Sequence, residues 1–461
     1  MSETAAGAPF DPIDFLRTSA PWLFAPELGV CVVGSMAAAA ACRQAGIPGP
    51  RPEDLDLSWA LAREAGASLL QQHGVLLPTT SGNQERGTLA MKVGGRRIEI
   101  TSLRGNAADS SIGSRIAADL GERDMTIGAI AVEITTGRIH DPHRGLDDWR
   151  RRRVAPVGDA AQRVREHPIR WLRYFRKAHE LGFAIDPRIR AIDLPCTLLH
   201  ELPPEAIALE LRAVFGKCAS PGRCLFEMHE VGLLDPLSPE LARQFDGRPA
   251  GPVRHHPEIS QALHLVLALE WAVTNTAHLD PRDAIAVRIA VACHDLGKSY
   301  TRASDLPSHP GHDQDGLRWV ERCLDRWPGF ADRRTRTLAL HVCALHLQVR
   351  QWEQLRSGTL ARMYETWFRA NDYPVELFAL AVAADSAGRL GLADTGAAEF
   401  AKVRANVEWL RTTCGGIDAA ALRARHGEDI EAFRLALHEA RARAIAAARR
   451  EDVTSPDATP S

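Results

Sequence analysis

A short apolar stretch that ends in a histidine and an aspartate constrains this 461-residue chain more than any other feature. Residues 284–292 are almost entirely apolar and predict a buried helix, and His294-Asp295 follows at its end. An imidazole beside a carboxylate is costly to bury unless both groups are bound to something. Further possible ligands lie on other predicted helices, at His264, His312, His346 and Asp385.

Four histidines and two aspartates offer the mixed nitrogen and oxygen ligands that suit a divalent transition metal better than a cysteine-rich zinc site does. The alternative is a scatter of histidines that cap or pack helices. The order of the six residues resembles that of the HD superfamily of metal-dependent phosphohydrolases. The resemblance implies a site for Ni²⁺, Mn²⁺ or Co²⁺ with Asp295 as a catalytic residue. Such an ion polarises a phosphoryl oxygen and lowers the pKa of a bound water.

Composition restricts the class of protein. The length predicts several domains, because it exceeds what one hydrophobic core supports. A net charge of -2 means that any RNA-binding surface must be a local patch. The 9 cysteines form no CxxC pair, which favours reduced thiols and a cytoplasmic location. No apolar run reaches the roughly 18–20 residues of a membrane span, and the acidic, proline-containing start does not resemble a signal peptide.

The pattern along the chain predicts an α+β protein with a sheet-containing start and a helical remainder. Four strands are expected, at 30–33, 55–59, 97–101 and 127–133, and helices follow from Val164 to about Arg450. The stretch Asp246–Pro257 is rich in proline, glycine and histidine and is the preferred linker. The expected domains are a head (1–153), a helical neck and body (154–250), the domain with the six ligands (251–395), C-terminal helices (396–450) and a disordered tail (451–461).

A second constellation lies in the head. Val33-Gly34-Ser35 is followed about twenty residues later by Asp54-Leu55-Asp56. Because alternate residues of a strand point to the same face, Asp54 and Asp56 present two carboxylates together. Such a pair can hold Mg²⁺ against a nucleoside triphosphate and an attacking hydroxyl. Short acidic pairs are common, so the motifs that follow carry the argument: residues 123–129, 141–148 and 166–173.

This succession resembles the class II tRNA nucleotidyltransferases, or CCA-adding enzymes, and the bacterial poly(A) polymerases of the DNA polymerase beta superfamily. It runs from Val32 to Leu211 and continues through His256-Pro257-Glu258 and the HD segment, as in the bacterial multifunctional CCA proteins. The resemblance implies addition of nucleotides from CTP and ATP to the 3′ ends of tRNA or other RNA, with Mg²⁺ on the catalytic Asp54 and Asp56. The nucleotide-binding residues that it implies are Gly34, Ser35, Arg104, Arg123, Asp124, Glu166, His167, Arg170 and Arg173.

Several positions depart from the family pattern. Ala38 and Ala39 stand where the family has the arginine and aspartate of its triphosphate-binding loop. His167 replaces the aspartate of the base template, Ala206 replaces a further arginine, and Gly128 replaces an asparagine. A protein template selects bases through fixed donors and acceptors, so these losses predict weak addition and poor discrimination between CTP and ATP.

A basic run follows the head. It interleaves with tryptophan and tyrosine and favours contact with RNA phosphates over the alternative of a solvated face. Asp147-Asp148, just before it, favours a helix N-terminus over a ligand pair. The expected RNA-binding residues are Arg150, Arg151, Arg152, Arg153, Arg173, Arg176 and Lys177. A monomer or a homodimer is expected.

Two functions remain open from the sequence. The first is a nucleotidyltransferase whose HD domain trims or repairs RNA ends as a phosphatase, phosphodiesterase or nucleotidase. The second is an HD phosphohydrolase acting on RNA ends or nucleotides, whose degenerate nucleotidyltransferase half only binds. A purely structural RNA-binding protein is a weaker third reading, since the six HD ligands form a complete set.

Overall fold

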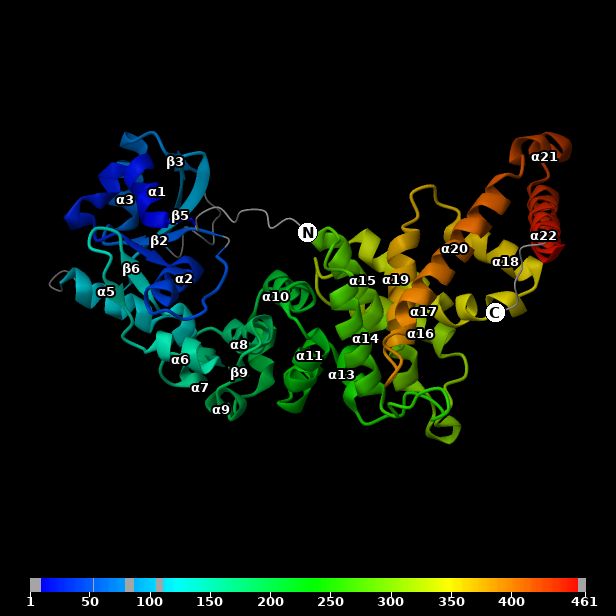
Figure 1. Cartoon of the computed structure of the whole chain (residues 1–461), viewed down its shortest axis with the longest axis horizontal. Helices are drawn as coiled ribbons and strands as arrows, with labels where there is room; N and C mark the ends of the chain where they lie inside the picture. The colour runs from blue at the N-terminus through cyan, green and yellow to red at the C-terminus, as the bar shows by residue number, and fades with distance from the viewer. Residues whose placement is uncertain (1–9, 53, 79–86, 105–110, 455–461) are drawn as a thin grey trace. The chain divides into compact units, whose positions relative to one another are not determined.

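The computed structural model describes residues 10–52, 54–78, 87–104 and 111–454. The chain divides into two compact units, Met1–Leu198 and Leu199–Ser461 (Figure 1). Among the described residues, the first unit contains all the β-strands and the second is built from helices. The expected α+β class, with a sheet at the N-terminal end and a mostly helical remainder, is therefore confirmed.

The first unit is organised around a mixed sheet, which has seven strands within the described residues, in the order β3-β4-β5-β2-β1-β6-β7. β1 is antiparallel to β2 and β6, while the central β2 is parallel to β5. The strand bounds are β1 Cys31–Val33, β2 Asp56–Trp59, β3 Leu76–Leu77, β4 Thr88–Val93, β5 Arg96–Ser102, β6 Ala131–Glu133 and β7 Ile139–His140. A separate parallel pair joins β8 Arg153–Val154 to β9 Ala184–Ile185.

Three of the four predicted strands are confirmed, and the fourth is shorter than expected. In 127–133 only Ala131–Glu133 is extended, because Thr126–Gly128 form a 3-10 turn. The sequence also missed β4, which pairs with β5 along its whole length. Five of its six residues are buried, so β4 lacks the alternation of apolar and polar residues that reveals a half-buried strand.

Both faces of the sheet are covered, because alternate residues of each strand belong to different cores. Val32 and Leu57 pack with residues of α1 and α3, whereas Val33 packs with Ile116 and Leu120 of α5. The helices of the first unit are α1 Pro12–Ser19, α2 Gly34–Gln44, α3 Arg63–Gln72, α5 Ile112–Gly121, α6 Gly145–Arg151, α7 Ala160–Glu166, α8 Ile169–Leu181 and α9 Pro187–Arg190.

The second unit is built around α15, which packs against α14, α17 and α19. Arg288 is the one charged residue in the buried stretch of α15, and its guanidinium donates to Phe215 O (2.8 Å) and Thr276 Oγ1 (3.0 Å). No helix in the described part of the chain is both long and apolar enough to cross a membrane. The helices are α10 Pro204–Lys217, α11 Pro221–Glu230, α12 Leu234–Leu237, α13 Pro239–Ala242, α14 Gln261–Asn275, α15 Pro281–Cys293, α16 His312–Asp325, α17 Arg333–Arg350, α18 Ser357–Met363, α19 Val375–Ala387, α20 Thr395–Gly415, α21 Ala419–His426 and α22 Ile430–Thr454.

The stretch Asp246–Pro257, predicted as a linker, lies inside the second unit and is held on several sides. Ala250 is buried and its amide donates to Ile259 O (2.7 Å), while His309 Nε2 donates to Pro249 O (2.9 Å). The composition correctly indicated a loop, but these bonds make it a packed one. At the other end, α22 extends through 451–454 of the predicted tail, and residues 455–461 lie outside the described residues.

Candidate active sites

The first site is a group of carboxylates on one face of the sheet. Asp56 opens β2 and is the register partner of Val33 on β1 and of Glu99 on β5, so these side chains share a face. Burial raises the pKa of Asp56, and the charges of Asp54 and Glu99 raise it further against the opposing effect of Arg123. Carboxylates that disfavour one another's charge in this way attract a divalent cation.

Glycine at position 34 brings the start of α2 beside this group. Gly34 has φ +68°, and a Cβ added there would lie 3.4 Å from Asp56 Oδ2. Within the described residues, no side chain caps the first turn of α2, so its amides are available at Gly34 and Ser35. Helix N-terminal amides favour phosphate, and here they lie next to carboxylates that can hold a cation. The arrangement fits a nucleoside triphosphate bound with Mg²⁺.

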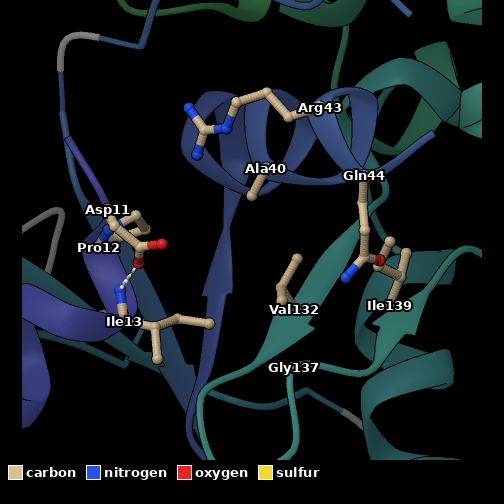
Figure 2. A pocket seen from close by; sticks show the side chains of 9 residues that line it. All are labelled: Asp11, Pro12, Ile13, Ala40, Arg43, Gln44, Val132, Gly137 and Ile139. Atoms are coloured by element: carbon tan, nitrogen blue, oxygen red, sulfur yellow. Dashed lines mark hydrogen bonds between the residues drawn. The ribbon is translucent and has the colours of Figure 1, made fainter. Parts of the chain in front are cut away.

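A pocket at the opposite end of α2 is a separate feature. Figure 2 shows Ala40, Arg43 and Gln44 of α2 on one side of a cavity of about 360 Å³, with Val132 and Ile139 on the other. The carboxylate of Asp11 in its lining accepts from the amide of Ile13 and so caps α1. This pocket therefore plays no part in the carboxylate site.

Asp119 and Glu99 are the residues of the first site that sequence reasoning missed. Asp119 is buried, and its carboxylate accepts from the amide of Arg104 (3.3 Å) and from the guanidinium of Arg123 (3.1 Å). It thereby anchors two predicted nucleotide-binding residues at once. Glu99 could have been found, since it is the acidic residue between Ile98 and Ile100 in the predicted strand.

The second site gathers the six predicted metal ligands from five helices or helix ends. His264 lies on α14, His294-Asp295 at the end of α15, His312 at the start of α16, His346 on α17 and Asp385 on α19. All six side chains are buried. Nε2 of His294 and of His312 each lie 3.2 Å from an oxygen of Asp295, and Nε2 of His264 lies 3.3 Å from Asp385 Oδ1. The structure thus brings the whole predicted set together.

Backbone carbonyls fix the direction of the four imidazoles. Nδ1 donates to Val291 O in His294 (2.7 Å), to His309 O in His312 (2.6 Å), to Cys343 O in His346 (3.0 Å) and to Gly388 O in His264 (3.2 Å). Because a carbonyl can only accept, each Nδ1 carries a hydrogen, and Nε2 is the ring atom left to bind a cation or a second proton. All four Nε2 atoms face the two carboxylates.

A metal ion fits the atoms at the centre. Within the described residues, Nε2 of His264, His294 and His312 and both carboxylate oxygens of Asp295 are buried with no hydrogen bond of acceptable geometry. Lys298 Nζ lies 2.6 Å from Asp295 Oδ2 and supplies one positive charge. Buried polar atoms are rarely left unpaired, so a group of this size calls for a further partner. A divalent cation is the partner that imidazole nitrogens and carboxylates have in common.

The pKa shifts at the second site also favour a bound cation. Burial opposes ionisation of Asp295, yet His294 and Lys298 hold its pKa well below the usual range. Burial lowers the pKa of His346 to about 4, so that ring is neutral at pH 7. For His264 burial is outweighed by the nearby carboxylates of Asp385 and Glu258, which raise its pKa to about 9, so in the metal-free state its ring carries a second proton that a bound cation would displace. Ionised carboxylates and a strong pull on positive charge are what cation binding requires.

The comparisons with known proteins agree with this geometry. Residues 46–155 match the family model of the poly A polymerase head domain, a range that includes Asp54, Asp56 and Glu99. The multifunctional CCA protein of Xanthomonas campestris pv. campestris is 32% identical over 293 residues, which are 62% of this chain and 69% of that protein. The chain belongs to the multifunctional CCA protein family.

Solved structures resemble this family member along most of its length. The Bacillus stearothermophilus CCA-adding enzyme in complex with CTP covers 97% of this chain with a TM-score of 0.62, at 18% identity and 100% coverage of that enzyme. The Thermotoga maritima CCA-adding enzyme complexed with tRNA covers 95%, with a TM-score of 0.58, at 14% identity and 97% coverage of that enzyme. At sequence identities this low, the structural similarity shows that the fold is shared.

Several residues of the predicted nucleotide-binding loop and base template are buried or paired in the fold. Ala38 and Ala39 are buried in α2 and carry no polar atom toward a triphosphate. The buried Arg170, predicted to bind nucleotide, donates instead to Glu166 Oε2 (3.0 Å) and Glu122 O (2.6 Å). Glu166 is bound in turn to Arg163. In this state, Glu166 and Arg170 brace the junction of α7 and α8.

His167 and Asp124 are two further residues that the sequence predicts to bind nucleotide. Burial lowers the pKa of His167, as do Arg170 and Arg104, so its imidazole is neutral at pH 7 and offers one donor and one acceptor. The main chain of Asp124 is fixed by Tyr174, whose hydroxyl donates to Asp124 O (3.1 Å), and its carboxylate lies 3.8 Å from Arg173.

Ion pairs occupy much of the basic run that follows the head. Arg153 lies 2.6 Å from buried Asp148, and Arg176 and Lys177 both bind Glu180. Arg150 pairs with Asp147, so Asp147 and Asp148 are structural, as the sequence favoured. Arg151 is exposed and makes no side-chain hydrogen bond to any described residue, and Arg152 lies over the ring of Phe183. Of the predicted RNA-binding residues, Arg151 and Arg152 therefore make no ion pair to a described residue, whereas Arg173 lies 3.8 Å from Asp124.

Proposed function

We propose that the first unit adds nucleotides from CTP and ATP to the 3′ ends of tRNA or other RNA. The observation that carries this proposal is the carboxylate group of Asp56 and its neighbours beside the first turn of α2. The name of the Xanthomonas relative and the CTP and tRNA complexes of the solved enzymes support it.

In this reaction the RNA 3′-oxygen bonds to the α-phosphorus of the nucleotide and pyrophosphate leaves. Mg²⁺ held by Asp54 and Asp56 would neutralise charge on the phosphates. Glu99 adds a third carboxylate, and the amides of Gly34 and Ser35 are placed to bind phosphate oxygens. Arg104 and Arg123 are held by Asp119, on the same side as Asp56.

Incubation of the purified chain with labelled CTP or ATP and a tRNA that lacks its 3′ end tests the proposal. We expect slow, Mg²⁺-dependent extension. No extension with either nucleotide would favour the alternative, in which the first unit only binds RNA or nucleotide.

Restoring the acidic template residue should sharpen nucleotide choice. In His167→Asp, a carboxylate that only accepts replaces an imidazole with one donor and one acceptor, as in the family pattern. We expect the ratio of kcat/KM values for CTP and ATP to change by roughly tenfold, since a single template hydrogen bond contributes on the order of 1–2 kcal/mol. His143→Asp, in the same unit but outside the template motif, is the control. Equal ratios in wild type and His167→Asp would show that position 167 does not read the base.

We further propose that the second unit is a metal-dependent phosphohydrolase that acts on phosphate groups of RNA ends or nucleotides. Its support is the set of buried imidazole and carboxylate atoms that lack a partner. Ni²⁺, Mn²⁺ and Co²⁺ suit these ligands. The ligands form two groups, His264, His294 and Asp385 on one side and Asp295, His312 and His346 on the other. Release of phosphate from phosphomonoesters and nucleotides, and opening of 2′,3′-cyclic phosphates to monoesters, test this proposal, with the bound metal measured by mass spectrometry.

Arg151, Arg152 and Arg173 should contact RNA phosphates. Reversing all three charges to glutamate is expected to weaken tRNA binding and to lower the slope of log Kd against log salt by roughly 2 to 3, because each lost phosphate contact removes about 0.7–0.9 from it. Filter binding at several salt concentrations measures both effects. Arg17, Arg43 and Arg138, all exposed in the first unit, provide a control with the same change in net charge. An equal loss of slope in the control variant would mean that the surface has no special role.

A further inference from the structure

The loop before α14 places a buried glutamate behind one of the metal ligands. Glu258 has a fully buried side chain and lies in the packed stretch that follows His256. Its Oε1 accepts from His256 Nδ1 (2.7 Å) and lies 3.1 Å from Nδ1 of His264. Its Oε2 accepts from the amide of Leu390 (3.3 Å), just beyond the helix that carries Asp385. Glu258 therefore contacts His264 at Nδ1, the ring nitrogen that faces away from Asp385 and the centre of the metal-ligand cluster.

His264 differs in this respect from the other three imidazoles. His294, His312 and His346 donate their Nδ1 hydrogens to backbone carbonyls, which are neutral acceptors. His264 has both a carbonyl, Gly388 O at 3.2 Å, and the carboxylate of Glu258 within reach of Nδ1. A carboxylate acceptor fixes the ring more firmly and makes Nε2 a stronger electron donor to a cation. Among the described residues, His264 alone of the four has such an acceptor behind it.

His256 completes the arrangement from the outside. Its ring packs against Gly251, where an added Cβ would lie 2.4 Å from His256 Cδ2, so the glycine makes room for the imidazole. Nδ1 of both histidines is directed at Glu258 Oε1, at 2.7 Å from His256 and 3.1 Å from His264. Nε2 of His264 points the opposite way, toward Asp385. The geometry suits Glu258 as a support for His264 and not as a ligand.

We propose that Glu258 is a positioning residue that holds His264 for the metal ion and, with His256 behind it, strengthens cation binding by the group of His264, His294 and Asp385. This inference rests on the proposed metal-dependent function of the second unit. Its effect should be confined to that group, because Asp295, His312 and His346 make no hydrogen bond to Glu258. The first unit should keep its nucleotide addition unchanged.

Glu258→Gln tests the proposal, because glutamine keeps the size of the side chain and removes its charge. Mn²⁺ and Ni²⁺ binding to the full metal-free chain is measured by titration calorimetry, together with the melting temperature without metal and the release of phosphate. We expect affinity for at least one ion to fall by roughly 10- to 100-fold, with phosphate release falling in parallel. Glu365→Gln is the matched control, since Glu365 also accepts from a histidine, His438 (3.0 Å), away from the cluster.

The outcomes separate the inference from the function on which it rests. Failure of the wild-type chain to bind either ion would overturn both. Tight binding by wild type and equally tight binding by folded Glu258→Gln would overturn the inference alone, as would an equal loss in Glu365→Gln. If Glu258→Gln does not fold, Glu258→Asp is measured in the same way. The aspartate side chain is shorter by one methylene, which moves the carboxylate away from His264. A several-fold loss of metal affinity therefore supports the proposal, and unchanged affinity overturns it.

Discussion

Replacing Asp295 by asparagine is expected to abolish metal-dependent phosphate release by the second unit. The two carboxylate oxygens of Asp295 face different imidazoles, Oδ2 toward His294 and Oδ1 toward His312, each at 3.2 Å. Loss of a residue that only supports a metal ligand lowers metal affinity or activity by about 10- to 100-fold. Asp295 faces both proposed ligand groups, so its replacement should lower phosphate release by more than about 100-fold. Phosphate release and bound metal are measured on the same preparation, and both should fall.

Asparagine is a sharper choice than alanine at this position. Lys298 Nζ lies 2.6 Å from Asp295 Oδ2 and both side chains are buried, so alanine would leave the ammonium without a polar neighbour and could unfold the protein. Asparagine keeps an oxygen there. Asp315→Asn, an exposed change on α16, serves as the control. Full activity in Asp295→Asn would contradict the assignment of the whole cluster as a hydrolytic site.

The second large effect is expected at Asp56. Asp56→Asn should reduce nucleotide addition by roughly 100- to 1000-fold, because a catalytic cation stabilises the transition state by several kcal/mol and each 1.4 kcal/mol is a factor of ten. Extension of a tRNA that lacks its 3′ end is the measurement. Asp54→Asn should have a similar effect, whereas Asp159→Asn, at the N-cap of α7, should have little. If addition is unchanged in both Asp54→Asn and Asp56→Asn, the site lies elsewhere.

The same substitution should make the protein more stable when Mg²⁺ is absent. Burial and the neighbouring carboxylates raise the pKa of Asp56 in the folded state. Above that pKa the ionised side chain destabilises the fold relative to the unfolded chain, and asparagine removes the penalty. The melting temperature of Asp56→Asn should therefore exceed that of wild type near pH 7.5. The difference should shrink as the pH falls toward the ordinary range of an aspartate and as Mg²⁺ is added.

The sequence predicted the second site more completely than the first, for a physical reason. His264, His294-Asp295 and Asp385 are polar residues in or at the end of apolar helices, where burial without a partner is so costly that their presence is informative. Glu99 and Asp119 of the first site lie among other polar residues and become significant only through strand register and a tertiary hydrogen bond. Glu258 was likewise visible as part of a motif, but not as the support of His264.

The basic run shows where local composition misleads. Arg153, Arg176 and Lys177 were counted as positive charge available to RNA, yet carboxylates of Asp148 and Glu180 neutralise them. Glu180 follows only a few residues after Lys177, so its ion pairs with Arg176 and Lys177 could have been predicted from the sequence. The second carboxylate near Arg153, Asp186, lies far along the chain and is brought close by the pairing of β8 with β9. Which arginines remain for a partner is thus decided by tertiary structure.

The carbonyl bonds of the four imidazoles also bear on how the second unit acquires its ion. Each ring is anchored by helix backbone or by the chain at a helix end, so the ligands are gathered when the protein folds. The conformational entropy of collecting them is lost at that stage, before any cation arrives. Entry and exit of the proposed cation would then require no refolding of the helices, and one ion could be exchanged for another on an assembled scaffold. The identity of the bound metal would accordingly depend on its supply in the surroundings and on the chemistry of the ligands.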